Sequence, residues 1–151
     1  MNAATDLLHD EPIAGDDPGF VAALLDAGLP VDDLAEVGRA FYAYRMRSGR
    51  LIGYGGFERY GRDALLRSIV VPSADRRQGI GRNLLNLLQQ RAYDQGARQS
   101  WLLTEAAAPF FERLGFKAAD RADAPQTILA TRQARSLCPA SATLMTRTIV
   151  F

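Results

Sequence analysis

Three arginines crowd the start of a predicted amphipathic helix. Arg76 and Arg77 lie in the loop 76–81, and Arg82 opens the helical pattern that follows. A helix N-terminus carries unpaired N–H groups and the positive end of the helix dipole, so each cation there costs a few tenths to about 1 kcal/mol. A bound polyanion such as a pyrophosphate would remove this conflict. A basic turn in contact with water and salt explains the charges equally well.

The glycines of this loop narrow the kind of phosphate site. Gly79 and Gly81 would let a ligand approach the backbone closely. The spacing Arg76-x-x-Gly79-x-Gly81 does not match the Gly-x-x-x-x-Gly-Lys-Ser/Thr pattern of a P-loop. It also does not match Gly-x-Gly-x-x-Gly followed by an acidic residue on the next strand, the pattern of a dinucleotide-binding fold. The segment predicts an anion-binding loop of another kind.

Regular elements must position this loop. Residues 65–71 are largely apolar and predict a central strand, and residues 82–95 carry apolar side chains on one helical face. Strands 41–46, 51–58 and 65–71 are expected to form an antiparallel meander, and the strand after helix 82–95 a parallel crossover. The remaining predicted elements are helices from Pro18 to Gly28, from Asp32 or Asp33 to Val37, over 107–114 and from Asp123 onward, and strands over 100–103 and 142–149.

Composition and charge limit the class of protein. The chain has 151 residues, which fits one domain, and its net charge of +1 provides no basic field for nucleic acid or an anionic membrane. Its single cysteine, Cys138, leaves no intrachain disulfide, and its single histidine, His9, argues against a metal site. The sequence carries no signal-peptide pattern, so a cytoplasmic location is expected. We expect residues 1–16 to be a flexible segment and residues 17–151 to form the domain.

Two segments carry a family resemblance. Val71–Gly81 resembles the acetyl-CoA-binding motif of the GNAT superfamily of N-acetyltransferases, Gln/Arg-x-x-Gly-x-Gly/Ala between a strand and a helix. Phe110–Phe116 resembles the second motif of that family, a short aromatic helix that ends in Gly-Phe. The resemblance implies an α/β fold: a mixed, mostly antiparallel twisted sheet of about six or seven strands, flanked by about four helices. It also implies that the sheet splits between its fourth and fifth strands.

A closer resemblance concerns three shorter segments. Ala64–Ser68, Leu102–Glu105 and Ser136–Ala142 are similar to the arsenic-resistance-associated branch of these N-acetyltransferases. Because that label usually reflects genetic neighbourhood, the similarity implies a context of detoxification and does not identify an acceptor.

The resemblance also implies how acetyl-CoA would bind as cosubstrate, without a metal. Backbone amides of the loop would hold the pyrophosphate, and the main chain of residues 69–71 would pair with the pantetheine arm and polarise the acetyl carbonyl. The residues implied in binding are Ile69, Val70, Val71, Arg76, Arg77, Gln78, Gly79, Ile80, Gly81, Arg82 and Phe111. The acetyl group would pass directly to an amine of a small-molecule acceptor. Neither nucleic acid nor a membrane is expected as a partner, and a homodimer stays open.

The sequence departs from the family pattern at three positions. Arg77 stands where the family often has glycine, and Thr104 where it often has asparagine. Phe111 replaces the tyrosine that often protonates the leaving thiolate, and phenylalanine has no proton to donate. A domain that binds acyl-CoA without catalysis is therefore the alternative function.

The catalytic candidates are two carboxylates. Glu58 comes first as a general base on a glycine-rich strand, and a solvent-facing charge is its alternative. Glu105 comes second, and a helix cap is its alternative. Arg67 lies within an apolar strand, where a structural ion pair and a ligand for an acceptor carboxylate are equally open. Cys138 is interpreted as a packed side chain, because direct acetyl transfer needs no covalent enzyme intermediate.

Overall fold

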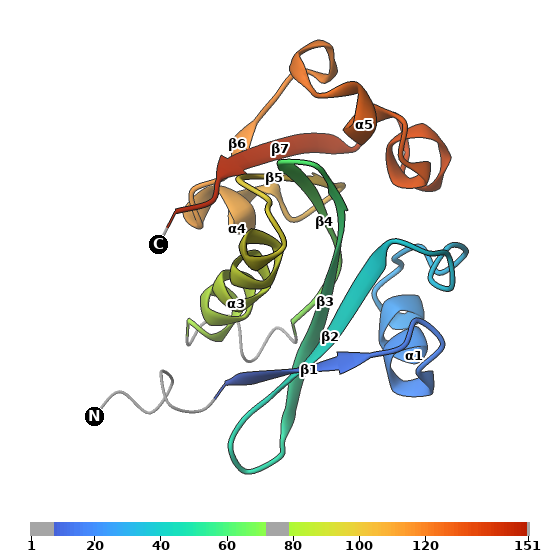
Figure 1. Cartoon of the computed structure of the whole chain (residues 1–151). Coiled ribbons are helices and arrows are strands. Elements are labelled where there is room, and N and C mark those ends of the chain that lie inside the picture. The colour runs from blue at the N-terminus through green and yellow to red at the C-terminus, as the bar shows by residue number, and fades with distance from the viewer. Residues whose placement is uncertain (1–7, 72–78, 151) are drawn as a thin grey trace.

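The computed structural model describes residues 8–71 and 79–150, which form one seven-stranded sheet (Figure 1). The strand order is β1-β2-β3-β4-β5-β7-β6, and every neighbouring pair is antiparallel except β4 and β5. The strands are β1 (His9–Ile13), β2 (Arg39–Arg45), β3 (Leu51–Tyr60), β4 (Asp63–Val70), β5 (Gln99–Thr104), β6 (Lys117–Ala118) and β7 (Thr143–Thr148). This mixed α/β architecture confirms the expected fold class.

Helices cover both faces of the strongly twisted sheet (Figure 1). On one face, α3 (Ile80–Asp94) buries Leu84, Leu85 and Leu88 against the central strands, because its apolar side chains recur at helical spacing. On the other face, α1 (Pro18–Asp26) places the Phe20 ring 4.9 Å from the Phe41 ring of β2. The remaining helical segments are α4 (Ala108–Arg113), α5 (Gln126–Leu129), a 3₁₀ turn (Arg121–Asp123) and a π-helical turn (Gln133–Leu137).

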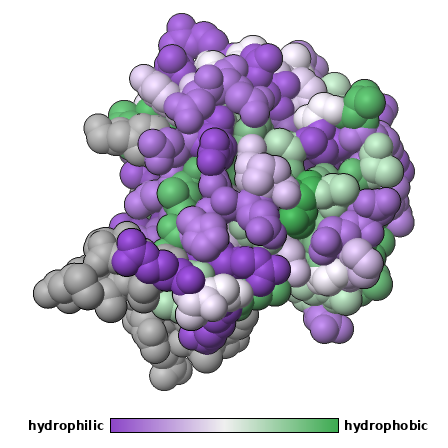
Figure 2. All heavy atoms as spheres, turned by 60° about the horizontal axis from the view of Figure 1, so that its bottom comes forward, coloured by the Kyte–Doolittle hydropathy of each residue, from purple (hydrophilic) through white to green (hydrophobic). Residues whose placement is uncertain are grey.

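The surface is mostly hydrophilic on the face shown in Figure 2, where apolar side chains occur in small separated groups. Among the described residues, the large apolar side chains that stay exposed are Leu25, Val37, Leu51, Tyr93 and Val150. Single exposed apolar residues of this kind are normal for globular proteins.

The sheet splits between β4 and β5. Their parallel pairing joins Asp63 to Gln99, Ala64 to Ser100 and Leu65 to Trp101, and it ends there. The later residues of the two strands have no pairing with each other, so the strands diverge toward their C-terminal ends. The divergence predicted from the family resemblance is confirmed.

A bulge in β4 reverses which face its side chains occupy. Ser68 has φ +56°. In the pairing with β3, Arg67 lies opposite Gly56 and Val70 lies opposite Tyr54. The two residues between them on β4, Ser68 and Ile69, therefore face a single residue of β3, Gly55, which defines a β-bulge. Before the bulge, Leu66 packs on the α3 side of the sheet. After it, Ile69 packs on that same side, although strict alternation would place it on the opposite face.

The expectation of a flexible N-terminal segment is wrong for His9–Ile13. These residues form β1, which pairs with β2 along its whole length. The Asp10 carboxylate accepts hydrogen bonds from Arg91 of α3 at 2.7 and 2.8 Å, which ties the strand to the helix. The acidic composition that suggested disorder instead suits an edge strand with polar side chains. Residues 1–7 lie outside the described part of the chain.

The short helix predicted from Asp32 or Asp33 to Val37 is also wrong. The structure has turns there, and the Asp33 side chain is fully buried. Its carboxylate binds Arg67 and Arg39, so a tertiary ion pair overrides the local helical pattern. The other predicted helices correspond to α1, α3, α4 and α5, and the predicted strands to β2, β3, β4, β5 and β7, whereas β6 was not predicted.

Candidate functional site

The divergence of β4 and β5 opens a cleft of about 740 Å³. One wall comes from β4, with Leu66–Ile69 and Val71, and the other from β5, the following turn and α4. The α1–β2 loop at Ala27–Pro30 also lines the cleft, together with Gln133 and Leu137 of the π-helical turn and Cys138 after it. The volume suits a site for a small molecule.

The N-terminus of α3 is built without a side-chain cap. Gly79 is its N-cap residue at φ +75°, a left-handed conformation that favours glycine, and no side chain accepts a hydrogen bond there. The first turn contains no acidic residue. The N–H groups of the first helical residues have no intrahelical acceptor and face the helix N-terminus, which suits an anion.

The Phe110 side chain of α4 packs against the first turn of α3 at Gly81. A Cβ added to Gly81 would lie 2.9 Å from Cζ of Phe110, so a larger residue there would require the Phe110 ring to shift. Phe110 lines the cleft, and the sequence interpretation missed it, although it belongs to the aromatic pair that signalled the second motif. Arg82 donates a hydrogen bond to the Arg113 carbonyl at 3.3 Å, which joins the first turn of α3 to the end of α4.

The predicted cofactor-binding residues divide into three groups. Ile69, Val71 and Phe111 line the cleft, whereas Val70 does not and packs on the α1 side of the sheet. Gly79, Ile80, Gly81 and Arg82 form the N-terminus of α3, where Ile80 and Gly81 are buried and Gly79 and Arg82 are exposed. Arg76, Arg77 and Gln78 lie outside the described residues.

Phe111 is buried in an aromatic cluster. Its ring lies 5.1 Å from that of Phe110 and 5.8 Å from that of Phe116, both in edge-to-face orientation. Because Phe111 also lines the cleft, it offers an apolar surface where the family often has a phenol.

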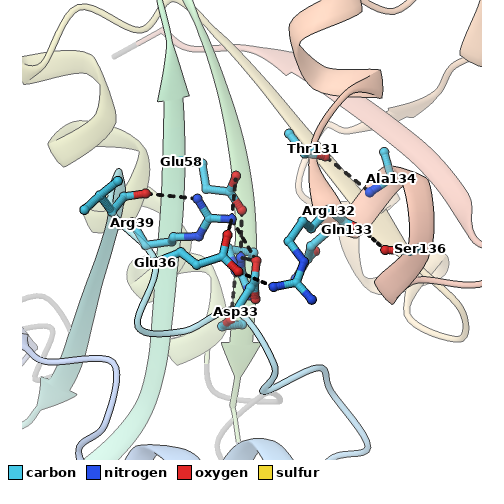
Figure 3. Close-up of polar contacts among 12 residues, drawn as sticks. Asp33, Glu36, Arg39, Glu58, Thr131, Arg132, Gln133, Ala134 and Ser136 are labelled. Atoms are coloured by element: carbon cyan, nitrogen blue, oxygen red, sulfur yellow. Dashed lines mark hydrogen bonds and ion pairs between the residues drawn. The ribbon is translucent and has the colours of Figure 1, made fainter.

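Arg67 is the centre of a buried ion network behind the cleft wall. Its guanidinium donates to Asp33 at 2.6 and 2.7 Å, to Glu58 at 2.7 Å and to Ser68 at 3.2 Å. Arg39 binds Asp33 from the other side at 2.9 Å (Figure 3). The sequence left open whether Arg67 is a structural ion pair, and the structure shows that it is.

The network also reaches the surface loops. Glu36 lies 3.5 Å from Arg39 and is bound by Arg132, which comes from the segment just before the π-helical turn (Figure 3). The α1–β2 loop and the π-helical turn, which both line the cleft, are thereby linked to each other.

The buried carboxylate of Asp33 is held in its charged form. Burial alone would raise its pKa, but hydrogen bonds from Arg67 and Arg39 outweigh burial and lower the pKa to about 2. Tyr60 shows the opposite effect, because burial and its hydrogen bond to Glu58 raise its pKa to about 12.

Glu58 lies inside this network. Only 1% of its surface is exposed, so the interpretation as a solvent-facing charge is wrong. Its two carboxylate oxygens accept hydrogen bonds from Arg67 and from the Tyr60 hydroxyl. Glu58 is not among the residues that line the cleft.

Glu105 lies in the cleft itself and is exposed. The helix-cap alternative does not apply, because the Ala107 N–H donates instead to Oγ1 of Thr104 at 3.0 Å. Within residues 8–71 and 79–150, no hydrogen bond or ion pair engages the Glu105 carboxylate. It is therefore available to a ligand.

Cys138 lines the cleft and is half-buried. Burial raises the pKa of its thiol, which disfavours the thiolate. Among the described residues, no group of three or more histidine, cysteine, aspartate or glutamate side chains could hold a metal ion. None of the helices in the described ranges is long and apolar enough to span a membrane.

Comparison with known families identifies one match. Residues 37–118 match the model of the acetyltransferase (GNAT) domain, and this range contains the meander, α3, β5 and α4. No curated protein matches the sequence.

Solved structures share the fold at low sequence identity. A GNAT-family acetyltransferase from Staphylococcus aureus Mu50 is 16% identical with a TM-score of 0.68, over 95% of this chain and 99% of that chain. N-acetylglutamate synthase from Neisseria gonorrhoeae, complexed with coenzyme A and N-acetyl-glutamate, is 17% identical with a TM-score of 0.74, over 95% of this chain and 35% of that chain. An aminoglycoside 6'-N-acetyltransferase complexed with coenzyme A is 20% identical with a TM-score of 0.63, over 94% and 97%.

Proposed function

Because the chain belongs to the GNAT acetyltransferase family, we propose that it transfers the acetyl group of acetyl-CoA directly to an amine of a small-molecule acceptor. The observation that carries the proposal is the cleft between β4 and β5, with an uncapped helix N-terminus beside it. One site thus combines a place for an anion with a chamber for an acceptor.

Acetyl-CoA is the cosubstrate, and the N-terminal turn of α3 fits its pyrophosphate. Backbone amides at Gly79, Gly81 and Arg82 would donate to the phosphates, together with Arg76, Arg77 and Gln78 of the preceding loop. The pantetheine arm would follow Ile69 and Val71, whose side chains line the cleft. Val70 would take part only through its main chain.

The bulge supplies the polarising group. The extra residue of a β-bulge leaves backbone groups outside the ladder, and here they belong to Ser68 and Ile69 at the cleft wall. A backbone N–H at this point would donate to the acetyl carbonyl and stabilise the oxyanion that develops during attack. The new bond joins the acceptor nitrogen to the acetyl carbon and the C–S bond breaks. The nitrogen loses one proton to water, and the thiolate takes one from water because Phe111 has none to donate.

Glu105 is the base that the structure favours. A free amine is needed for attack, and the Glu105 carboxylate can accept the ammonium proton directly or through a water molecule. Glu58 is the first candidate from the sequence, but its two oxygens already accept hydrogen bonds from Arg67 and Tyr60. We therefore propose Glu105 as the general base and Glu58 as a structural partner of Arg67.

A pair of glycine substitutions tests the binding loop. Gly79 (φ +75°) and Gly61 (φ +63°) have the same left-handed conformation, and neither has an atom within 4 Å of an added Cβ. Valine should strain the backbone similarly at both positions. Acetyl-CoA should raise the Tm of wild type and Gly61→Val, but not of Gly79→Val. An equal ligand-induced shift in both variants would exclude the α3 N-terminus as the binding site.

The second candidate is an acyl-CoA-binding domain without catalysis, which Phe111 favours. Release of free CoA thiol with a panel of amines distinguishes the two functions, since the second predicts a thermal shift without thiol release. We further propose a cytoplasmic role in detoxification or arsenic resistance, on the resemblance of Ser136–Ala142. Loss of arsenic tolerance on deletion of the gene would support that role. Sedimentation of the purified chain would decide whether it forms a homodimer.

A further inference from the structure

Among the residues that the structure describes, three charged residues line the cleft, and two of them belong to its acceptor end. They are Arg67, Glu105 and Arg113. Arg113 lies at the end of α4, where its carbonyl accepts from Arg82 of α3, so it belongs to the cofactor end. Within residues 8–71 and 79–150, Arg67 and Glu105 therefore set the charge of the acceptor end.

Arg67 reaches the cleft wall with little capacity left for a ligand. A guanidinium has five N–H donors, and Arg67 makes four hydrogen bonds, to Asp33, Glu58 and Ser68. Its side chain is 0% exposed. An acidic acceptor that approached Arg67 would also approach two buried carboxylates.

The network is neutral as a whole. Two arginines, Arg67 and Arg39, face two carboxylates, Asp33 and Glu58, at distances of 2.6 to 3.7 Å. The pKa of Asp33 stays at about 2, so the balance persists at physiological pH. Arg67 thus offers no net positive charge to the chamber.

Glu105 provides the remaining charge. Its exposed carboxylate lies on the opposite wall and has no partner in the described part of the chain. The rest of this end is formed by apolar side chains, including Leu29, Pro30 and Leu137, with the amide of Gln133. An ammonium would gain an ion pair there, whereas a carboxylate would meet a like charge and an apolar wall.

From this arrangement we infer that the acceptor is an amine with an apolar body and no carboxylate, and that the chamber rejects α-amino acids. The neutralised Arg67 and the free Glu105 determine this specificity. The inference rests on the proposed function, because only an acetyltransferase has an acceptor to select. The preference for binding amines over amino acids can nevertheless be measured without turnover.

Matched pairs of amines and amino acids test the inference. 3-Methylbutylamine and L-leucine differ only by the carboxylate, as do 2-phenylethylamine and L-phenylalanine. With the full chain saturated in CoA, each amine should bind at least about tenfold more tightly than its amino acid by calorimetry. The methyl ester of the amino acid should regain most of the affinity, because it removes the charge and keeps the bulk.

Two variants locate the effect. Glu105→Gln should weaken amine binding about tenfold, while Glu112→Gln, an exposed α4 carboxylate outside the cleft lining, should leave it unchanged. Glu58→Gln removes one negative charge beside Arg67 and leaves the network with a net positive charge. The difference in binding affinity between each amine and its amino acid should therefore become smaller. If Glu58→Gln does not fold, Glu105→Gln and the esters still test the preference.

The outcomes separate this inference from the proposed function. Amino acids that bind as tightly as the amines, or amines that do not bind at all, would overturn the inference. Amines that bind selectively without any release of CoA thiol would support the inference and contradict the acetyltransferase proposal.

Discussion

Asp33→Asn probes the ion network behind the cleft. In the folded protein the pKa of Asp33 is lowered from 3.8 to about 2, and each pKa unit corresponds to about 1.4 kcal/mol. The ionised carboxylate therefore contributes about 2 kcal/mol at pH 7. The substitution also leaves Arg67 and Arg39 facing Glu58 alone, and breaking a buried pair costs about 3–5 kcal/mol.

The pH dependence has a defined sign. A lowered folded-state pKa gives stability that is present above the unfolded pKa near 3.8 and is lost as the pH falls through about 2. As the pH falls through this range, wild type should lose the stability that ionised Asp33 contributes. The Asp33→Asn variant has no carboxylate at this position, so its stability should not change for this reason. The gap in unfolding free energy between the two proteins should therefore narrow by about 1 kcal/mol between pH 7 and pH 3.

Urea unfolding followed by circular dichroism measures both quantities. At pH 7 we expect Asp33→Asn to lose about 3–5 kcal/mol, or roughly 10 °C in Tm. Glu11→Gln is the matched control, because Glu11 forms a half-exposed pair with Arg45 at 3.6 Å and should change stability by less than about 1 kcal/mol. A loss for Asp33→Asn as small as that of the control, or a gap that does not change with pH, would refute the reasoning.

The remaining predictions concern the cleft. Phe111→Tyr should leave turnover unchanged or raise it, while Phe111→Ala should weaken acetyl-CoA binding or cost about 3–5 kcal/mol of stability, since the ring is buried. An alanine variant that is silent in both assays would place Phe111 outside the site. Glu105→Gln should remove the acidic limb of the pH profile of turnover with acetyl-CoA affinity intact, whereas Glu58→Gln should mainly destabilise the fold. If both variants keep the wild-type profile, bulk water deprotonates the amine.

The elements around the site could be predicted because their signals are local. The apolar stripe of α3 and the glycines before it are visible in consecutive residues, and so is the aromatic pair Phe110 and Phe111. These patterns follow from helix and strand periodicity and from loop chemistry. The position of the cleft between β4 and β5 came instead from the family resemblance that these motifs carry.

The ion network could not be predicted, because its members are far apart in the sequence. Asp33 and Arg67 are separated by 34 positions, and each residue alone has an ordinary local interpretation. The same interaction overrides the helix predicted near Asp33. β1 escaped prediction for a related reason, since its polar residues are held by pairing with β2 and by the contact between Asp10 and Arg91.

The bulge in β4 explains how one strand serves two purposes. Arg67 must point toward the loop that carries Asp33, on the α1 side of the sheet, while Ile69 packs on the α3 side with the core beneath the cleft. Strict alternation would put both side chains on one face, because they are two positions apart. The extra residue at Ser68 breaks that alternation and also leaves backbone groups outside the ladder at the cleft wall. Residues 69–71 are all apolar, so their sequence has no polar and apolar alternation that would reveal which side chains lie on which face of the sheet. The bulge, which places Arg67 and Ile69 on opposite faces, therefore appears only in the structure.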